Sequence, residues 1–220
     1  MRHRSHTGLI IVLIILLLFV LTAGALYVVF GAGIMLRGSW EREIDLTEDV
    51  RDGISEYMST AIGGDDIDIA LGEGDIRIKS VLTIGRDGTW VETVDRQSYE
   101  EAVVKSKACL EESVKALLEK RLADAYIESN RSVDELVNAA LGMELDKYLD
   151  KCAPTVLPSY ESLQEMYGSN TGYEAKNDKV MLTDTGKEIT FKASSDMLVL
   201  IYTKEAVVYT RVKEVGENVE

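Results

Sequence analysis

The hydrophobic and polar positions divide the chain into one long apolar run and a longer patterned region. Residues 8–36 carry no charged side chain and read GLIIVLIILLLFVLTAGALYVVFGAGIML. About 20 apolar residues, each rising roughly 1.5 Å, are enough to cross a bilayer core. The run therefore predicts a transmembrane helix over residues 8–36, preceded by a short cytoplasmic stub at residues 1–7.

Charges on the two sides of this run predict its orientation. Arg2 and Arg4 precede it together with the terminal amine and two histidines, whereas Arg37 and Arg42 follow it among acidic residues. The two pairs of arginines nearly balance, because acidic residues count little in the positive-inside rule. The terminal amine and the histidines favour a cytoplasmic N-terminus, so the rest of the chain is expected to be extracytoplasmic. A cleaved signal peptide is the alternative, because Ala23-Gly24-Ala25 has the small residues of a cleavage site. Cleavage there would leave an exposed apolar tail, and we therefore favour an uncleaved signal-anchor.

The next segments change from helical to alternating periodicity. Residues 37–46 are expected to be a juxtamembrane joint, with Trp40 as an anchor at the lipid interface. Apolar residues at helical spacing then predict a helix over residues 47–62. Period-two alternation over residues 67–71, 75–84 and 89–94, with glycine-containing turns between them, predicts a three-stranded antiparallel meander.

The middle of the chain carries two capping boxes. Ser98 and Glu101 open a predicted helix that continues to about residue 129, and Ser132 and Glu135 open a second one over residues 132–152. Only a short break at Asn130-Arg131 separates them, so the two helices are expected to form an antiparallel helical hairpin.

The last third returns to strands after a short predicted helix over residues 159–167 and a loop at residues 168–172. Alternating segments predict four strands at residues 179–183, 188–193, 196–203 and 206–212, followed by a frayed tail at residues 216–220. The predicted fold class is α+β: an N-terminal transmembrane helix followed by one domain over residues 47–215, which contains an antiparallel β-meander, a helical hairpin and a second antiparallel β-meander.

Composition removes several classes of function. The chain has 220 residues, 24 Lys+Arg, 38 Asp+Glu and a formal net charge of −14. Its two histidines, His3 and His6, both precede the apolar run, so histidine-based triads and histidine-ligated zinc are excluded from the rest. The acidity argues against nucleic acid as a partner. No nucleotide-binding or serine-nucleophile motif is present, and no cofactor is expected.

The two cysteines are candidates for a disulfide. Cys109 lies 21 residues before Asn130 and Cys152 lies 22 residues after it. Equal arms of an antiparallel hairpin would place the two residues level with each other, and an extracytoplasmic location permits oxidation. The sequence therefore predicts a Cys109–Cys152 disulfide, with two buried free thiols as the alternative.

An acidic cluster surrounds the first predicted hairpin, and its members are Asp65, Asp66, Asp68, Glu73 and Asp75. Oxygen-rich clusters suit Ca²⁺, but the EF-hand spacing fails at Ala70 and Leu71. The isoleucines between the acids favour the solvated face of a strand. This cluster is the candidate for a metal site, and the strand interpretation is preferred over it.

Three tyrosines lie near the predicted loop at residues 168–172, namely Tyr160, Tyr167 and Tyr173. Exposed tyrosines on a loop are typical anchors for a protein partner. The alternative is that they cover the end of the sheet, which is the commoner role of such side chains.

These patterns favour a single-pass membrane-anchored extracytoplasmic protein-interaction or structural module without enzymatic activity. Its expected partners are the lipid bilayer through residues 8–36, a protein of the envelope or cell surface, and copies of itself. The alternative is a membrane-anchored hydrolase that uses carboxylates or a Ser/Lys pair. An enzyme of that kind requires a concave pocket in which ionisable groups converge.

Overall fold

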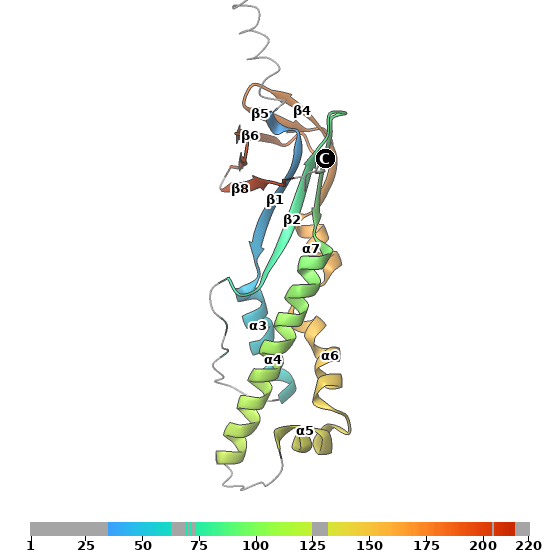
Figure 1. Cartoon of the computed structure of the whole chain (residues 1–220), viewed down its shortest axis with the longest axis vertical. Helices are drawn as coiled ribbons and strands as arrows, with labels where there is room; N and C mark the ends of the chain where they lie inside the picture. Colours follow the sequence, from blue (N-terminus) through green and yellow to red (C-terminus); the bar gives the residue numbers. More distant parts are fainter. Residues whose placement is uncertain are drawn as a thin grey trace, which may run out of the picture. The chain divides into compact units, whose positions relative to one another are not determined.

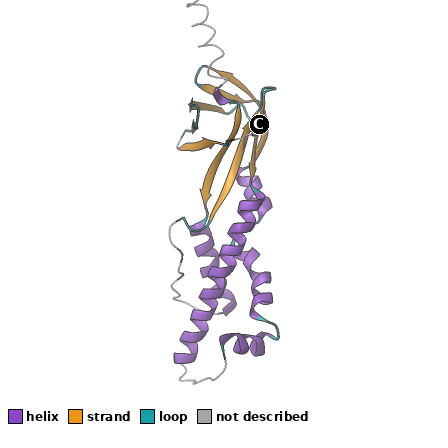
Figure 2. Ribbon diagram, in the orientation of Figure 1, coloured by secondary structure: helices purple, strands orange, loops and turns teal. Residues whose placement is uncertain are grey.

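The computed structural model describes residues 35–62, 69, 71, 74–124, 132–203 and 205–213. They pack into two compact units. The barrel unit comprises residues 35–41, 82–91 and those from Asn170 onward, and the helical unit comprises Arg42–Val81 and Glu92–Ser169. The division falls within the first three strands of the chain. Figure 2 colours the strands and helices, and each unit consists mainly of one of these two.

Eight strands form a closed barrel in the order β1 to β8 (Figure 1). Their bounds are β1 Gly38–Asp45, β2 Arg77–Ile84, β3 Thr89–Val94, β4 Ser169–Lys176, β5 Lys179–Leu182, β6 Glu188–Ala193, β7 Met197–Ile201 and β8 Ala206–Arg211. From β4 onward each strand pairs antiparallel with the next. Strand β8 then pairs antiparallel with β1, where Arg211 lies opposite Trp40. Closure of this kind leaves no unpaired sheet edge.

The barrel unit has an aromatic and aliphatic core. Trp40, Trp90 and Tyr209 are its largest fully buried side chains. They pack with Leu36, Leu82, Ile84, Val180, Leu182, Ile189, Phe191, Leu198 and Leu200. Along β7 and β8, inward positions such as Leu198 and Tyr209 alternate with outward ones, as the pleat of a strand requires.

The helical unit has its own core, built from amphipathic helices. These are α3 Thr47–Tyr57, continued by a π-helical turn at Met58–Ile62, then α4 Arg96–Asp124, α5 Val133–Leu141, α6 Leu145–Val156 and α7 Tyr160–Tyr167. The core contains Val50, Ile54, Leu110, Val114, Leu145, Leu149 and Val156 among its buried residues. α6 packs against both α3 and α4. α3 and α6 approach closely at Gly53, where an added Cβ would lie 2.5 Å from the carbonyl oxygen of Val156.

One prediction about the helices needs correction, and another is confirmed. The predicted helix over residues 132–152 is two helices, because Gly142 adopts φ of 67° and ends α5. A positive φ is inexpensive only for glycine, and this geometry is the usual end of a helix. The short helix predicted over residues 159–167 is confirmed as α7.

The predicted fold class is wrong. Instead of two meanders in an α+β domain that follows a transmembrane helix, the strands close into one eight-stranded barrel. The predicted joint at residues 37–46 contains β1, and the predicted loop at residues 168–172 opens β4. The predicted strand at residues 67–71 lies largely outside the described residues.

The predicted membrane span also lies outside the described residues, apart from Met35 and Leu36. Among the helices that the structure does describe, none combines the length and the apolar character needed to cross a membrane. Trp40, expected at the lipid interface, is instead fully buried in the barrel core, and so is Leu36.

Candidate functional site

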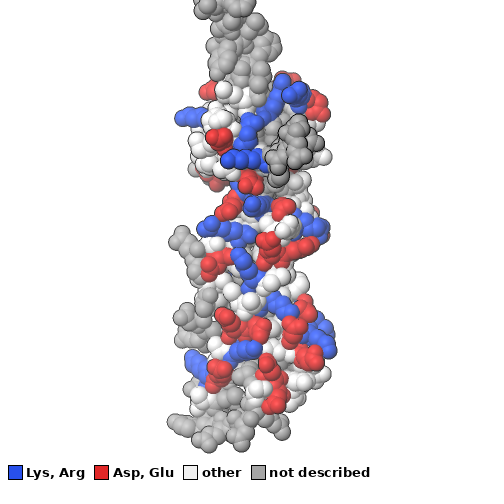
Figure 3. Space-filling view, viewed as in Figure 1, with Lys and Arg blue, Asp and Glu red and all other residues white. Residues whose placement is uncertain are grey.

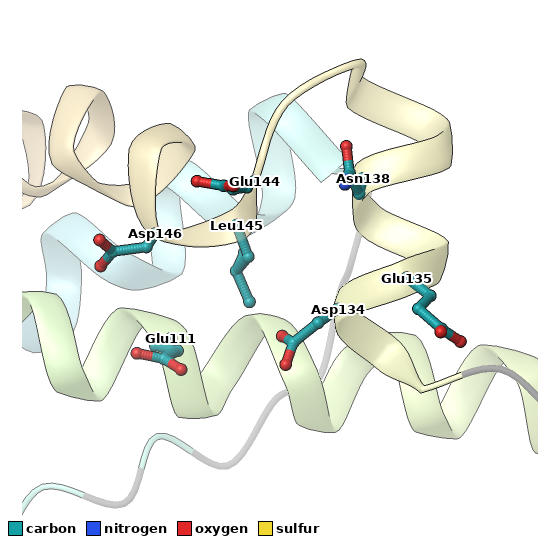
Figure 4. A pocket seen from close by; sticks show the side chains of 7 residues that line it. All are labelled: Glu111, Asp134, Glu135, Asn138, Glu144, Leu145 and Asp146. Atoms are coloured by element: carbon teal, nitrogen blue, oxygen red, sulfur yellow. The ribbon is translucent and has the colours of Figure 1, made fainter.

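The helical unit contains a cavity of about 370 Å³ between α4, α5 and α6 (Figure 4). Five of its seven lining residues are acidic. The lining consists of Glu111, Asp134, Glu135, Asn138, Glu144, Leu145 and Asp146. Figure 4 shows Glu111 on α4 facing α6, while Leu145 points into the space between α6 and α4. We call this cavity the acidic pocket.

Helix capping explains why the acids gather there. Ser132 and Glu135 form the capping box of α5 that the sequence predicts, with Asp134 in the same first turn. Glu144 occupies the N-cap position of α6, and Asp146 lies in the first turn of that helix. Carboxylates are stabilised near helix N-termini by the macrodipole and by the free N–H groups. Two helix starts facing α4 therefore concentrate negative charge on one surface.

Lysines of α4 neutralise part of this charge. Lys115 Nζ lies 2.7 Å from Glu111 Oε1 and 3.7 Å from Asp134 Oδ1, so one ammonium group bridges two helices. The hydrogen bond to Glu111 raises the pKa of Lys115 above its ordinary value. Because these side chains are about a third to two-thirds exposed, each pair stabilises the fold by less than about 1 kcal/mol.

A second lysine of α4, about two turns earlier, makes a similar bridge to α6. Lys107 Nζ contacts Asp146 Oδ1 at 2.6 Å and also contacts Asp150, and these two hydrogen bonds raise the pKa of Lys107. Lys147 pairs with Glu144 at 3.0 Å. Each lining carboxylate is thus engaged by a lysine or, in Glu135, by the Ser132 backbone.

This arrangement suits electrostatic recognition better than catalysis. A hydrolytic carboxylate pair needs two groups that face a substrate across open space. Here one ammonium group fills the space between Glu111 and Asp134. Exposed ion pairs exchange readily, so a cation from a partner can replace a lysine of α4 at little cost.

The serines of the described region offer no nucleophile paired with a lysine. The buried hydroxyls of Ser106 and Ser113 donate to the carbonyl oxygens of Ala102 and Cys109 one turn earlier in α4. Ser80 is fully buried and donates to Glu92 Oε1 at 2.7 Å. Among the described residues no hydrogen bond joins a serine hydroxyl to a lysine, so the Ser/Lys form of the hydrolase hypothesis gains no support.

Glu92 anchors a buried charge network that the sequence patterns miss. Arg42 contacts its Oε1 through Nε at 3.1 Å and through Nη2 at 3.0 Å, and the two side chains are 17% and 8% exposed. The Arg42 guanidinium also lies 5.5 Å from the ring centre of Tyr167. The alternation of β3, TWVETV, places Glu92 on the inward face with Trp90 and Val94. This alternation is the sequence signal that could have predicted the pair, because a carboxylate on an inward strand position needs a cationic or hydrogen-bonding partner.

The predicted acidic cluster is only partly visible. Asp65, Asp66, Asp68 and Glu73 lie outside the described residues. Asp75 is exposed, and its backbone carbonyl accepts a hydrogen bond from Lys105 Nζ at 3.4 Å. Within the described part of the chain, no group of three or more potential ligands could hold a metal ion.

Two of the three predicted interaction tyrosines belong to the helical unit and are engaged there. The Tyr160 hydroxyl donates to the Val94 carbonyl at 3.0 Å, and its ring packs edge-on against Tyr99 at 5.5 Å. Arg96 covers the same ring at 4.1 Å. Tyr167 lies under Arg42, as described above. Both rings therefore have intramolecular partners.

Tyr173, the third predicted interaction tyrosine, belongs to the barrel unit. Its hydroxyl donates to the Gly85 carbonyl at 3.1 Å, and its ring packs edge-on against Trp90 at 6.1 Å. Tyr160 and Tyr173 thus stabilise turns and strands of their own units.

The predicted disulfide is wrong, because Cys109 and Cys152 are both free. The prediction assumed two straight helical arms, but the break at Gly142 changes the course of the second arm. Cys152 Sγ lies 3.1 Å from the Tyr57 hydroxyl of α3, which also contacts the Tyr148 hydroxyl. Burial raises the pKa of Tyr57 and that of the Cys109 thiol, so neither group ionises readily.

Comparison of the chain with known protein families, with curated proteins and with solved structures finds no match.

Proposed function

We propose that the chain is a membrane-anchored extracytoplasmic interaction module whose helical unit binds a basic partner protein of the envelope or cell surface. The observation that carries this proposal is the separation of charge between the two units. From residue 35 onward, the segments of the barrel unit hold 9 basic and 11 acidic residues, whereas those of the helical unit hold 13 basic and 27 acidic residues. The net charge is therefore −14 for the helical unit and only −2 for the barrel unit.

A net charge of this size raises the local concentration of cations and accelerates encounter with basic partners. Figure 3 shows basic side chains interspersed among the acidic ones on the face in view. Because the charges are mixed, long-range attraction alone gives little specificity. The acidic pocket supplies a local recognition site for one cationic side chain.

The pocket has the chemistry for a lysine or arginine of the partner. Its carboxylates can receive the cationic head, and Leu145 provides apolar surface for the methylene stem. Lys115 and Lys107 are the groups to be displaced, and both form surface ion pairs of small net worth. Binding would exchange one ion pair for another and add apolar contact.

The anchor belongs to the proposal on sequence grounds. The uncharged run at residues 8–36 is long enough for a bilayer, and the terminal amine with His3 and His6 favours a cytoplasmic N-terminus. Membrane fractions washed with alkaline carbonate test this part directly. The chain is expected to stay with the lipid and to float with it in a density gradient, and its release by carbonate would contradict the anchor.

A fluorescent oligolysine peptide tests the interaction. We expect the full chain in detergent to bind it with an affinity that falls as salt is raised, because exposed charges are screened. The variant Glu111→Gln/Asp134→Asn/Glu144→Gln removes three charges from the acidic pocket and should weaken binding about tenfold, equivalent to about 1.4 kcal/mol.

The matched control removes three exposed acids of the same unit outside the pocket, Glu100→Gln/Glu161→Gln/Glu165→Gln. It should weaken binding less than threefold, or about 0.7 kcal/mol. Equal losses in the two triple variants would show that net charge alone attracts the peptide, and the pocket would then have no specific role.

A further inference from the structure

The barrel unit holds the end of the predicted membrane segment in its core. Met35 and Leu36 have helical backbone, and the Leu36 side chain is fully buried among barrel residues. Trp40 Nε1 donates to the Leu36 carbonyl at 2.7 Å, and Arg211 Nη2 donates to the Met35 carbonyl at 3.1 Å. These are two of the carbonyl groups that a helix end leaves without intrahelical partners.

Arg211 also contacts the ring of Trp40. Its guanidinium lies 4.4 Å from the ring centre, close to the Met35 carbonyl group that it binds. Side chains of β1 and β8 therefore fix the last residues of the apolar run. No linker separates that run from the barrel unit, because Leu36 belongs to both.

This junction has a consequence for lipid contact if the run is embedded. Headgroups extend about 5 to 8 Å beyond each side of the hydrocarbon core. The barrel surface around Leu36 must then lie at headgroup level, since Leu36 ends the apolar run and is already inside the barrel.

The surface around this junction has a suitable composition. Arg37 follows Leu36 directly and is exposed. The Val212 N–H donates to the Ser39 carbonyl at 2.9 Å, so the antiparallel register brings exposed Lys213 beside Gly38. Met35 is 40% exposed, and Met197, opposite Thr210 in the neighbouring strand, is 47% exposed.

We propose that Met35, Arg37, Met197, Arg211 and Lys213 form a collar that rests on phospholipid headgroups, with the cations near phosphate groups and the methionines in the interface. The proposal rests on the membrane anchoring proposed above. Basic residues combined with apolar side chains are typical of segments that lie in a membrane interface. The collar's acidic neighbours include Asp196, whose carbonyl accepts from the Arg211 N–H at 2.9 Å, and Glu41 of β1, since Thr210 lies between Glu41 and Met197 of β7.

Energy transfer from tryptophan to a dansyl headgroup lipid measures the distance between barrel and membrane. The chain has two tryptophans, Trp40 and Trp90, and both lie in the barrel core. We expect efficient transfer from the full chain in vesicles of phosphatidylcholine, with or without phosphatidylglycerol. Flotation of the same vesicles reports anchoring separately. A chain that does not float contradicts the anchor, whereas a chain that floats without transfer contradicts the collar alone.

A linker variant separates tethering from affinity. A Gly/Ser insertion of about 20 residues between Ile34 and Met35 gives the barrel a reach of about 25 Å while it keeps every contact of Leu36. Transfer should persist in vesicles that contain phosphatidylglycerol and fall at least twofold in phosphatidylcholine alone. Equal transfer losses in the two lipids would overturn the proposal.

Charge reversal in the linker variant tests the collar residues. Arg37→Glu/Lys213→Glu should lower transfer at least twofold in vesicles with phosphatidylglycerol, and Arg211 is left unchanged because it holds Met35. The matched control, Lys176→Glu/Lys192→Glu on β4 and β6, should keep transfer. Equal effects of the two charge reversals on energy transfer would overturn the proposal. A transfer efficiency that rises with the number of protein molecules per vesicle would also overturn it, because the collar would then bind a second copy of the chain and not lipid.

Discussion

The barrel unit and the helical unit each bury a hydrophobic core, but they differ in net charge and in the residues that form the core. The barrel unit is nearly neutral and buries two tryptophans, a tyrosine and a phenylalanine inside a closed sheet. The helical unit carries most of the excess of acidic residues and buries mainly aliphatic side chains between helices. In a closed sheet, the backbone N–H and C=O groups form hydrogen bonds with other strands, which can be distant in sequence. In a helix, these groups form hydrogen bonds within the helix itself. Core packing should therefore dominate the barrel unit, and local electrostatics and close helix contacts should matter more in the helical unit.

The largest effect is expected from the barrel core. Trp40→Ala removes a fully buried indole and the hydrogen bond to Leu36. Loss of the aromatic contacts and the cavity left behind should lower the free energy of unfolding by about 3 to 5 kcal/mol. Urea denaturation of the full chain in detergent, followed by the fluorescence of Trp90, measures this change.

Met197→Ala is the control for this prediction, because the methionine is on the outward face of the same barrel and 47% exposed. Its effect should stay within about 0.5 kcal/mol. A loss from Met197→Ala as large as that from Trp40→Ala would mean that the outer face is itself a packed surface.

The second largest effect is expected from the buried charge pair of the helical unit. Glu92→Gln keeps the shape of the side chain but removes the negative charge that pairs with Arg42. The positive charge of Arg42 then stays in a largely buried site without an opposite charge from residue 92. Removing one partner of a buried pair costs roughly 3 to 5 kcal/mol, and the partial exposure of Arg42 reduces this to about 2 kcal/mol. Thermal or urea unfolding followed by circular dichroism measures the loss.

Glu43→Gln makes the same chemical change on β1, two strands from Glu92. Its pair with Arg77 is about half exposed on both sides, so the expected loss is less than about 0.5 kcal/mol. Equal losses from Glu92→Gln and Glu43→Gln would contradict the view that burial gives the Arg42–Glu92 pair its importance.

Local pattern was sufficient for much of the fold but not for its closure. The strands β5 to β8 are confirmed, because each alternates and each is bounded by turn residues. Strand β1 was missed since GSWEREID has few apolar positions, and only Trp40 and Ile44 are buried along it. Its partner β8 is about 170 residues away, with Trp40 opposite Arg211. Neither segment, taken alone, has a pattern that predicts pairing with a strand so far away in the sequence.

The candidate site was less accessible to sequence reasoning. The capping box at Ser132 and Glu135 was predicted and confirmed, yet Gly142 was not read as the end of α5. Without that break, Glu144 and Asp146 are interior residues of one long helix rather than the start of α6 facing α4. The false disulfide came from the same error, because it assumed one straight arm from residue 132 to Cys152.

A moderate effect is expected where two helices of the helical unit touch. Gly53→Ala places a methyl group 2.5 Å from the Val156 carbonyl oxygen, which is backbone and cannot rotate away. Overpacking costs about 1 to 3 kcal/mol, and the gain in helix propensity offsets up to about 1 kcal/mol. We expect the free energy of unfolding, measured in urea, to fall by about 1 to 2 kcal/mol.

Ser55→Ala is the control, because Ser55 is exposed on the same helix, and this variant should be neutral or slightly stabilising. A Gly53→Ala protein of unchanged stability would show that α3 and α6 are not in close contact.

The smallest effect is expected at the start of α3, and it depends on pH. Asp45 Oδ1 accepts from the Thr47 N–H at 2.9 Å, and its hydrogen bonds with Thr47 lower the pKa of Asp45 below the ordinary value of 3.8. A carboxyl with a lowered pKa in the folded state stabilises the fold above its unfolded pKa and loses that contribution as the pH falls through the folded pKa. Asp45→Ala should therefore cost about 0.5 to 1 kcal/mol at neutral pH, and the difference from wild type should shrink as the pH falls below 3.8.

Asp45→Asn keeps an acceptor oxygen and should cost less than Asp45→Ala at neutral pH. Urea unfolding across the acid range measures both differences, and a gap between wild type and Asp45→Ala that stays constant with pH would show that the carboxylate charge has no part in holding this helix start.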